Sequence, residues 1–357
     1  MFHRTLFNRL RATPNSKWCS HVSTSELSTI GSRSRGSVSK KKPPDTKFVQ
    51  KKRSGRTRCF SVHSNGSLCK LSIAGIQQKK LDEKYISMVT AYDYTSALLA
   101  DRAGFDILLV GDSLGMVQLG YDGTEKVTMD DMLHHCKAVS RTSKNSFLIG
   151  DLPFGSYLNV DDAVQNACRL VKEGGMDAVK LEGGTRVERS IAAIVDSGIP
   201  VQGHIGLTPQ TATQLGGFKV QGKTAEAAVG LYEDAMALQK AGCFSIVLEC
   251  VPERVATEIT QSLDIPTIGI GAGRGTNGQV QVFHDVIGMY DRLQPKFAKQ
   301  YVNTSDIICD ALSSYREEIE TARFPDESHV FKIKDTQFES FRYAAGLTVF
   351  EHDGNMY

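Results

Sequence analysis

The sequence lacks any long apolar run: its longest apolar stretches have the length of a β-strand and are broken by glycine or charge. A membrane-spanning helix needs about 20 consecutive apolar residues, and a secretory signal peptide needs an apolar core. Neither pattern is present in the sequence, so we expect no membrane partner.

Acidic residues are almost absent from positions 1–80, where 18 Lys and Arg stand against only Glu26 and Asp45. Arg- and Ser-rich segments of this kind are typical of organelle transit peptides, and FHRTLFNRLRA can form a short basic amphipathic helix. We therefore expect a disordered mitochondrial transit peptide and linker over residues 1–70. The alternative is a disordered basic tail or a nuclear-type cluster, KKRSGRTR at 51–58. The remaining 277 residues hold 24 basic and 38 acidic side chains, which argues against a nucleic-acid partner.

The eight cysteines include no CxxC pair. No other ligand spacing supports a zinc site. Scattered thiols that behave as small apolar side chains are typical of a reduced compartment. Three cysteines lie in the basic segment and five lie in helix- or strand-like patterns: Cys136, Cys168, Cys243, Cys250 and Cys309.

From about residue 85 onward, short β-rich runs alternate with helical patterns. This alternation predicts parallel strands joined by crossover helices, and about 260 residues suffice for a (β/α)8 TIM barrel. A doubly wound open sheet is the alternative. The eight predicted strands are YISMVTA (85–91), FDILLVG (105–111), SFLIG (146–150), DAVKL (177–181), PVQGH (200–204), SIVLE (245–249), PTIGIG (266–271) and VQVF (280–283).

The helical patterns between these strands have recognisable ends. Thr128 can cap a helix in VTMDDMLHHCKAVSR, and Thr224 can cap the helix in TAEAAVGLYEDAMALQKAG, which ends before Gly242. In DDAVQNACRLVKEGG, apolar residues follow helical spacing up to the glycine pair. These lengths fit crossover helices.

Polar or ionisable residues stand at the ends of five consecutive predicted strands. In a (β/α)8 barrel the chemistry lies at the C-terminal strand ends, so these side chains would meet at one rim. They are Asp112 and Ser113 after the second strand, Asp151 after the third, Lys180 and Glu182 at the fourth, His204 at the fifth and Glu249 at the sixth.

Taken singly, each of these residues also has a structural explanation. Asp112 could form an Asx turn, Asp151 could orient the turn that follows it, and Glu182 could cap the next helix. His204 could be a satisfied core imidazole, and Glu249 could form a salt bridge at the rim. Taken together, four carboxylates at one barrel mouth repel one another unless a cation or a proton neutralises them, and this favours a metal site.

The oxygen donors suit Mg²⁺ or another hard divalent ion. Asp112 and Asp151 follow adjacent strands and can reach one ion. Lys180 and Glu182 are two residues apart and share a face, so Glu182 can touch the ion directly or through water while Lys180 meets an anionic substrate. This arrangement suits a 2-oxo acid, whose enolate a divalent ion stabilises. Glu249 follows an apolar run and is the best candidate for the base.

The glycine-rich segment GIGAGRG at 269–275 has neither the spacing nor the position of a Rossmann fingerprint. After the seventh strand of a barrel it could cradle a phosphate. We favour the alternative, a tight loop that lets a ligand approach the backbone closely.

Nine short strings make residues 70–331 resemble the ketopantoate hydroxymethyltransferase family, and they occur in the family's order. They are MVTAYDY (88–94), LLVGDSLGM (108–116), DLPF (151–154), VKLEGG (179–184), GHIGLTPQ (203–210), GGFKVQG (216–222), VLECVP (247–252), IGIGAG (268–273) and PKFAK (295–299).

The resemblance implies a barrel of the phosphoenolpyruvate/pyruvate superfamily over residues 71–331, with a C-terminal extension at 332–357. It implies a Mg²⁺-dependent enzyme that transfers a hydroxymethyl group from 5,10-methylenetetrahydrofolate to 3-methyl-2-oxobutanoate. The product would be 2-dehydropantoate, on the route to pantothenate and coenzyme A. A homo-oligomer, decameric in bacterial members, is implied by analogy.

The resemblance also implies roles for the residues at the strand ends. One departure concerns GRGTNGQV at 273–280, where Asn277 stands in place of the family's usual Asp. By motif, Asp112, Asp151 and Glu182 resemble the metal site; Asp112, Ser113, Asp151 and Lys180 resemble the oxo-acid contacts; Glu249 resembles the proton acceptor; and His204 lies in a motif near the substrate.

Three rival functions remain open from the sequence. One is nucleic-acid binding through the basic residues 33–58, which deletion of the leader should abolish without affecting any enzyme activity. A lyase or mutase of the same superfamily would act on oxaloacetate-like substrates, but such enzymes commonly carry a cysteine-bearing active loop that the sequence lacks. A catalytically idle barrel could serve as a binding or scaffolding protein, although the complete set of strand-end residues argues against it.

Overall fold

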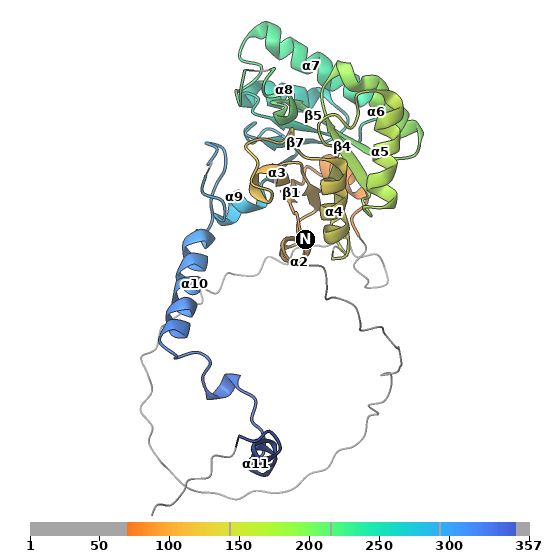
Figure 1. Cartoon of the computed structure of the whole chain (residues 1–357). Helices are drawn as coiled ribbons and strands as arrows, with labels where there is room; N and C mark the ends of the chain where they lie inside the picture. Colours follow the sequence, from red (N-terminus) through yellow and green to blue (C-terminus); the bar gives the residue numbers. More distant parts are fainter. Residues whose placement is uncertain (1–69, 143, 215, 293, 348–357) are drawn as a thin grey trace, which may run out of the picture. The chain divides into compact units, whose positions relative to one another are not determined.

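The computed structural model describes residues 70–347 except positions 143, 215 and 293. In this part of the chain eight parallel strands close into a barrel in sequential order, with helices around it (Figure 1). This confirms the predicted (β/α)8 barrel and its eight strands. The predicted transit peptide lies outside the described residues. The strands are β1 (Ile86–Thr90), β2 (Ile107–Val110), β3 (Phe147–Asp151), β4 (Ala178–Glu182), β5 (Val201–Gly206), β6 (Ser245–Glu249), β7 (Thr267–Ile270) and β8 (Gly278–Gln281).

Strand β8 closes the barrel and begins two residues before the run predicted from the sequence. Gly278 pairs with Ile86 of β1 and with Ile268 of β7. A Cβ atom on Gly278 would lie 2.5 Å from the carbonyl oxygen of Ile86, so only glycine fits this approach. The start of β8 therefore rests on backbone pairing, and the apolar pattern appears only at Val280.

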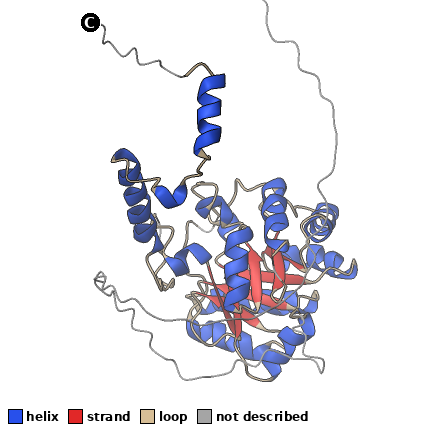
Figure 2. Ribbon diagram, turned by 90° about the horizontal axis from the view of Figure 1, so that it is seen from below, coloured by secondary structure: helices blue, strands red, loops and turns tan. Residues whose placement is uncertain are grey.

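The strands are buried on both sides, and alternate residues belong to different parts of the core. Met88 and Ile107 belong to one apolar cluster, which also contains Ile76 of helix α1. Val89 and Leu108 belong to a larger second cluster that includes residues of the surrounding helices. Figure 2 shows the strands at the centre with helices around them. Apolar side chains fill most positions along the strands, and the polar residues predicted for the site lie at the C-terminal strand ends.

The surrounding helices begin at the predicted capping residues. The Thr128 side chain accepts a hydrogen bond from the backbone N–H of Asp131, and the Thr224 side chain accepts one from Ala227. Gly242 follows α7 with φ of 98°, in the left-handed region. The helices are α1 (Ile73–Leu81), α2 (Tyr94–Ala103), α3 (Leu114–Val117), α4 (Met129–Ser140), α5 (Val160–Lys172), α6 (Glu188–Asp196), α7 (Ala225–Lys240), α8 (Glu253–Ser262), α9 (Phe283–Ile287), α10 (Thr304–Glu320) and α11 (Asp335–Ala344), with short 3-10 turns η1 (Thr185–Val187), η2 (Pro209–Thr211) and η3 (Glu327–His329).

The connection from β7 to β8 differs from the other crossovers. Residues 271–277, all of which the structure describes, contain no helix. This is the glycine-rich segment of the sequence. The segment is therefore a loop, and both interpretations, a tight loop for close ligand approach and a phosphate cradle, stay predictions.

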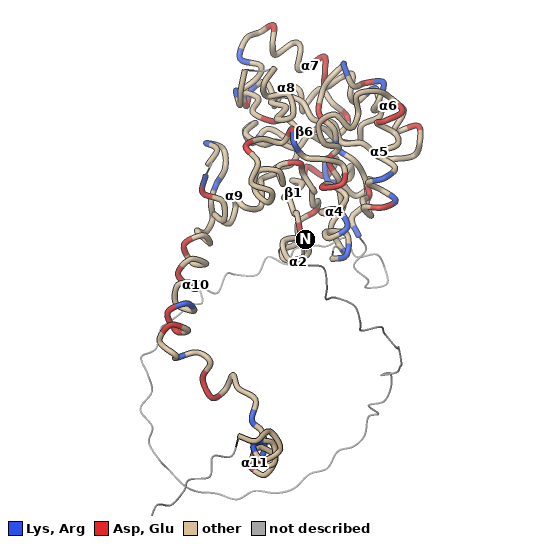
Figure 3. The backbone as a smooth tube through the Cα atoms, viewed as in Figure 1, with Lys and Arg blue, Asp and Glu red and all other residues tan. Residues whose placement is uncertain are grey.

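The helices α10 and α11 contain no buried residue. They carry exposed apolar side chains that include Ile308, Leu312 and Phe341. Figure 3 shows acidic positions along α10. Within the described residues, no helix is long and apolar enough to cross a membrane.

Candidate active site

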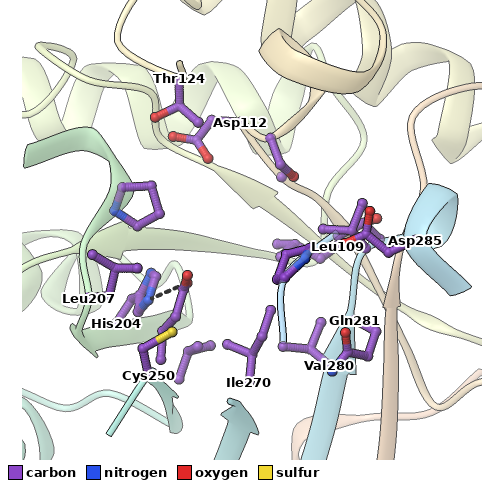
Figure 4. Close-up of a pocket in the computed structure, with 18 of the residues that line it drawn as sticks. Leu109, Asp112, Thr124, His204, Leu207, Cys250, Ile270, Val280, Gln281 and Asp285 are labelled. Atoms are coloured by element: carbon purple, nitrogen blue, oxygen red, sulfur yellow. Dashed lines mark ion pairs between the residues drawn. The ribbon is translucent and has the colours of Figure 1, made fainter. Parts of the chain in front are cut away.

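A cavity of about 390 Å³ opens at the C-terminal ends of the barrel strands (Figure 4). Its walls come from strand ends and from the loops that follow them, as expected for a barrel of this type. Every residue that the sequence singled out for chemistry lines this one cavity. These residues are Asp112, Ser113, Asp151, Lys180, Glu182, His204 and Glu249.

Asp112 and Ser113 lie between β2 and the short helix α3. Asp112 is 4% exposed, and its backbone N–H donates a hydrogen bond to Asp151 Oδ2 at 3.4 Å. The Ser113 hydroxyl is hydrogen-bonded to the Tyr92 hydroxyl at 2.8 Å. The charge at the end of β2 is therefore buried and faces the neighbouring strand, rather than serving only as a turn residue at the surface.

Lys180 stands among the carboxylates of three strands. Strand pairing sets Asp151 opposite Lys180, and the Lys180 ammonium lies 2.5 Å from Asp151 Oδ2 and 3.9 Å from Glu182 Oε1. Burial alone would lower the pKa of Lys180, but the surrounding carboxylates outweigh burial and raise that pKa. Lys180 is therefore a permanent cation at the floor of the cavity, available to an anionic substrate.

His204 bridges the two glutamates of the site. Its Nδ1 lies 3.3 Å from Glu182 Oε1 and its Nε2 lies 3.2 Å from Glu249 Oε2 (Figure 4, dashed line at His204). Burial would lower the pKa of His204, but the charge of Glu182 opposes it and raises the pKa to about 9. Neither ring nitrogen makes an aligned hydrogen bond, so both contacts are ion pairs. An imidazolium here links Glu249 electrostatically to the acid cluster.

Asp112 and Asp151 are the side chains whose surroundings fit a divalent cation. Burial raises the pKa of Asp112 well above its ordinary value, and the charges of Asp151 and Glu182 raise it further. Asp151 Oδ1 is buried without a hydrogen-bond partner. A cation between these two carboxylates would relieve the repulsion and satisfy the orphaned oxygen.

Glu182 is engaged differently from the two aspartates. Its Oε2 accepts the backbone N–H of Gln210 at 3.1 Å, while its Oε1 faces His204. Within the described part of the chain, no group of three His, Cys, Asp or Glu side chains already has the spacing of a metal site. Mg²⁺ typically takes one or two protein carboxylates and retains water ligands, so two aspartates are sufficient.

Gln210 is a central residue of the site that sequence reasoning did not identify. Its side-chain amide donates to Asp112 Oδ2 at 2.8 Å and to the Leu152 carbonyl at 2.9 Å. Its Oε1 accepts the Tyr157 hydroxyl at 2.5 Å. Gln210 thus ties the loop after β5 to the ends of β2, β3 and β4. Its only signal in the sequence is its position as the last residue of GHIGLTPQ.

Two further cavity residues were also missed. Asp285 of α9 lines the cavity, and burial raises its pKa to about 6. Cys250 directly follows Glu249 with φ of 49°, an uncommon backbone conformation for a residue with a side chain. Such outliers gather at functional sites. The conformation of Cys250 turns the chain immediately after Glu249, the candidate base.

The walls above this polar floor are apolar. Figure 4 shows Leu207, Cys250, Ile270 and Val280 around the cavity. The same cavity is also lined by Phe218, Val220 and Phe297. Apolar walls with a few polar groups at one end are typical of a pocket that binds a small molecule.

A closed (β/α)8 barrel with buried acids and cations at its strand ends is characteristic of an enzyme. The family model described as ketopantoate hydroxymethyltransferase matches residues 70–327. The 3-methyl-2-oxobutanoate hydroxymethyltransferase of Heliobacterium modesticaldum is 55% identical over 267 residues, covering 74% of this chain and 97% of that protein. The enzyme of the same name from Moorella thermoacetica is 55% identical over 264 residues, covering 74% and 98%. The chain therefore belongs to the ketopantoate hydroxymethyltransferase family, as its motifs indicated.

Solved structures with a similar chain fold include 2,3-dimethylmalate lyase, described as a member of the PEP mutase/isocitrate lyase superfamily. The two chains share 16% sequence identity, with a TM-score of 0.46 and coverage of 80% of this chain and 99% of the lyase.

Proposed function

We propose that this enzyme transfers a hydroxymethyl group from 5,10-methylenetetrahydrofolate to 3-methyl-2-oxobutanoate and gives 2-dehydropantoate. The reaction is that of the relatives named 3-methyl-2-oxobutanoate hydroxymethyltransferase. The observation that carries the proposal is the composition of one cavity, which is lined by an acid pair, a buried lysine and a separate glutamate. For a 2-oxo acid that loses a proton at C3, these groups would supply a cation site beside the 2-oxo oxygen, a cation for the carboxylate and a base.

We assign Asp112 and Asp151 as ligands of Mg²⁺, with Glu182 reaching the ion through water or directly. The orphaned Asp151 Oδ1 and the oxygen-only donor set support this assignment. When bound, the ion polarises the 2-oxo group and lowers the energy of the enolate. Gln210 holds Asp112 in place for this task.

Lys180 and Ser113 bind and orient the oxo acid. The protonated Lys180 attracts the substrate carboxylate, and Ser113, held by Tyr92, offers a hydroxyl beside Asp112. These contacts would place C3 of the substrate toward the opposite wall, where Glu249 lies.

Glu249 acts as the proton acceptor. Its side chain is 14% exposed and sits beside His204, away from the aspartate pair. Glu249 takes the C3 proton, and the C–H electron pair forms the enolate. Water adds to the folate methylene carbon, both of its C–N bonds break with their electron pairs going to the two nitrogens, and tetrahydrofolate and formaldehyde result. The enolate carbon then bonds to the formaldehyde carbon, the C=O electron pair goes to oxygen, and Glu249 returns its proton to this oxygen to give the hydroxymethyl group.

We further propose that the protein is imported into mitochondria and forms a homo-oligomer. The basic, acid-poor composition of residues 1–70 supports import. The exposed apolar side chains of α10, which include Ile308 and Leu312, support association. Light scattering of the purified protein measures the oligomer, and a monomer at micromolar concentration would refute association.

Turnover is tested with 3-methyl-2-oxobutanoate, 5,10-methylenetetrahydrofolate and Mg²⁺, on the protein without residues 1–70. We expect 2-dehydropantoate to form and a chelator to abolish its formation. A correctly assembled protein that gives no product, or a rate that chelation leaves unchanged, would contradict the proposal. An oxaloacetate-type substrate serves as the test of the lyase alternative.

A further inference from the structure

A second cavity of about 510 Å³ adjoins the active-site cavity on the side of β7 and β8. Five residues line this second cavity and not the first: Tyr85, Gly271, Gly273, Arg274 and Gln279. The residues that line both cavities are Val220, Cys250, Gln281, Lys296 and Phe297. The two cavities therefore lie next to each other and share one boundary, so a long ligand that crosses this boundary would occupy both.

The two cavities differ in charge. The second is lined by Arg274 and Lys296 and by no carboxylate. Glu253 is not among the lining residues, but its Oε1 lies 3.6 Å from Arg274 Nε and accepts the backbone N–H of Arg274 at 3.3 Å. Both side chains are largely exposed, so this ion pair is weak. The acidic residues that line the active-site cavity are Asp112, Asp151, Glu182, Glu249 and Asp285. The active-site cavity also has basic lining residues, but Lys180 and His204 face its carboxylates, and Lys296 stands at the boundary that both cavities share. The anionic end of a long ligand would therefore meet Lys296 and Arg274, with no lining carboxylate, in the second cavity.

Two segments that the reaction chemistry does not use build this second cavity. The helix-free loop after β7 supplies Gly271, Gly273 and Arg274, and the PKFAK string supplies Lys296 and Phe297. Gly271 has φ of 64°, and a Cβ atom there would lie 2.8 Å from Phe297 Cδ1. The glycine therefore lets the Phe297 ring lie directly against the loop. The result is an aromatic wall next to two cations.

The folate donor has chemistry that matches this pair of cavities. Its reactive methylene must reach the substrate C3 near Glu249. The rest of the molecule, an aminobenzoyl ring followed by a glutamate with two carboxylates, must leave the acidic cavity. We propose that the second cavity binds this aminobenzoyl-glutamate tail, with Phe297 against the ring and with Lys296 and Arg274 facing the carboxylates. This inference rests on the proposed function and adds the site that holds the donor.

Additional glutamates on the folate tail should strengthen binding. Each added glutamate brings one more carboxylate toward the same two cations. Exposed charge pairs are individually weak, so removal of one cation is expected to raise the folate KM by about two- to fivefold, and removal of both by roughly tenfold. The effect should be larger for a polyglutamyl than for a monoglutamyl donor, and high salt should reduce it.

The test compares Lys296→Ala, Arg274→Ala and the double variant with the unaltered enzyme. Folate KM and kcat are measured with mono- and pentaglutamyl 5,10-methylenetetrahydrofolate, and tetrahydrofolate binding is measured by calorimetry. The matched control is Lys299→Ala, a cation of the same string whose ammonium lies 4.9 Å from the Tyr301 ring centre and which lines neither cavity. We expect KM and Kd to rise in the first three variants, with little change in kcat, and to stay unchanged in the control.

The possible outcomes separate this inference from the proposed function. Equal folate affinities in all variants, with normal turnover of the unaltered enzyme, would refute the second cavity as the tail site and leave the reaction intact. An equal loss in Lys299→Ala would also refute it, since that result indicates a general effect of surface charge. An unaltered enzyme that neither binds folate nor forms product would refute the proposed function and this inference together.

Discussion

Replacing Gln210 by leucine tests how the acid pair is held for a metal ion. The substitution keeps the size of the side chain but removes its hydrogen bonds to Asp112, to the Leu152 carbonyl and from Tyr157. A hydrogen bond to a charged acceptor contributes about 1.5–3 kcal/mol, which corresponds to a tenfold or larger change in an equilibrium constant. Loss of a residue that orients a metal ligand typically costs about 10–100-fold in metal affinity. We therefore expect Mg²⁺ to bind Gln210→Leu about 10–100-fold more weakly.

The assay is calorimetric titration of Mg²⁺ together with measurement of Tm and kcat. Tyr157→Phe removes only one neutral hydrogen bond of this network and should weaken Mg²⁺ binding by less than about tenfold. Gln214→Leu, an exposed glutamine four residues along, is the matched control and should leave the Mg²⁺ Kd unchanged. A folded Gln210→Leu protein that binds Mg²⁺ as tightly as the unaltered enzyme would refute the role assigned to Gln210.

Two further predictions follow from the site geometry and a third from the composition of the N-terminal segment. Asp112→Asn should weaken Mg²⁺ binding more than Gln210→Leu does, because it removes a proposed ligand charge, and an unchanged Kd in calorimetry would exclude Asp112 as a ligand. The pKa of His204 is raised to about 9, so its contribution to stability is complete below about pH 6.5 and declines as the pH rises toward 9. Between pH 7 and 9, Tm should therefore fall less steeply in His204→Gln than in the unaltered enzyme. An identical slope in both proteins would contradict this role of His204. Residues 1–70 fused to a fluorescent protein should direct it to mitochondria in microscopy, whereas a nuclear or diffuse signal would support the alternatives.

The sequence was most informative where the fold depends on local patterns. Apolar runs of strand length located all eight strands, and Thr128 and Thr224 marked helix starts because a capping residue acts through its own backbone neighbours. Polar residues at consecutive strand ends could be predicted to meet, because all parallel strands of a barrel present their C-terminal ends at one rim. The structure brings all seven into one cavity.

The parts that could not be predicted depend on tertiary contacts. Gln210 is a neutral side chain in a loop, and nothing in its local sequence shows that it will reach Asp112. The left-handed conformation of Cys250 and the backbone-paired start of β8 at Gly278 are equally invisible in a hydropathy pattern. The pairing of His204 with two glutamates depends on the register of β4, β5 and β6, which only the closed barrel determines.

The central claim is a division of labour in which the aspartate pair holds a cation and Glu249 moves the C3 proton. The most direct measurement follows exchange of the C3 hydrogen of 3-methyl-2-oxobutanoate in deuterated water by NMR, without folate. We expect the unaltered Mg²⁺-loaded enzyme to exchange this hydrogen, and Glu249→Gln to bind Mg²⁺ and the oxo acid normally but to lose the exchange. Exchange at an undiminished rate in Glu249→Gln would contradict the account.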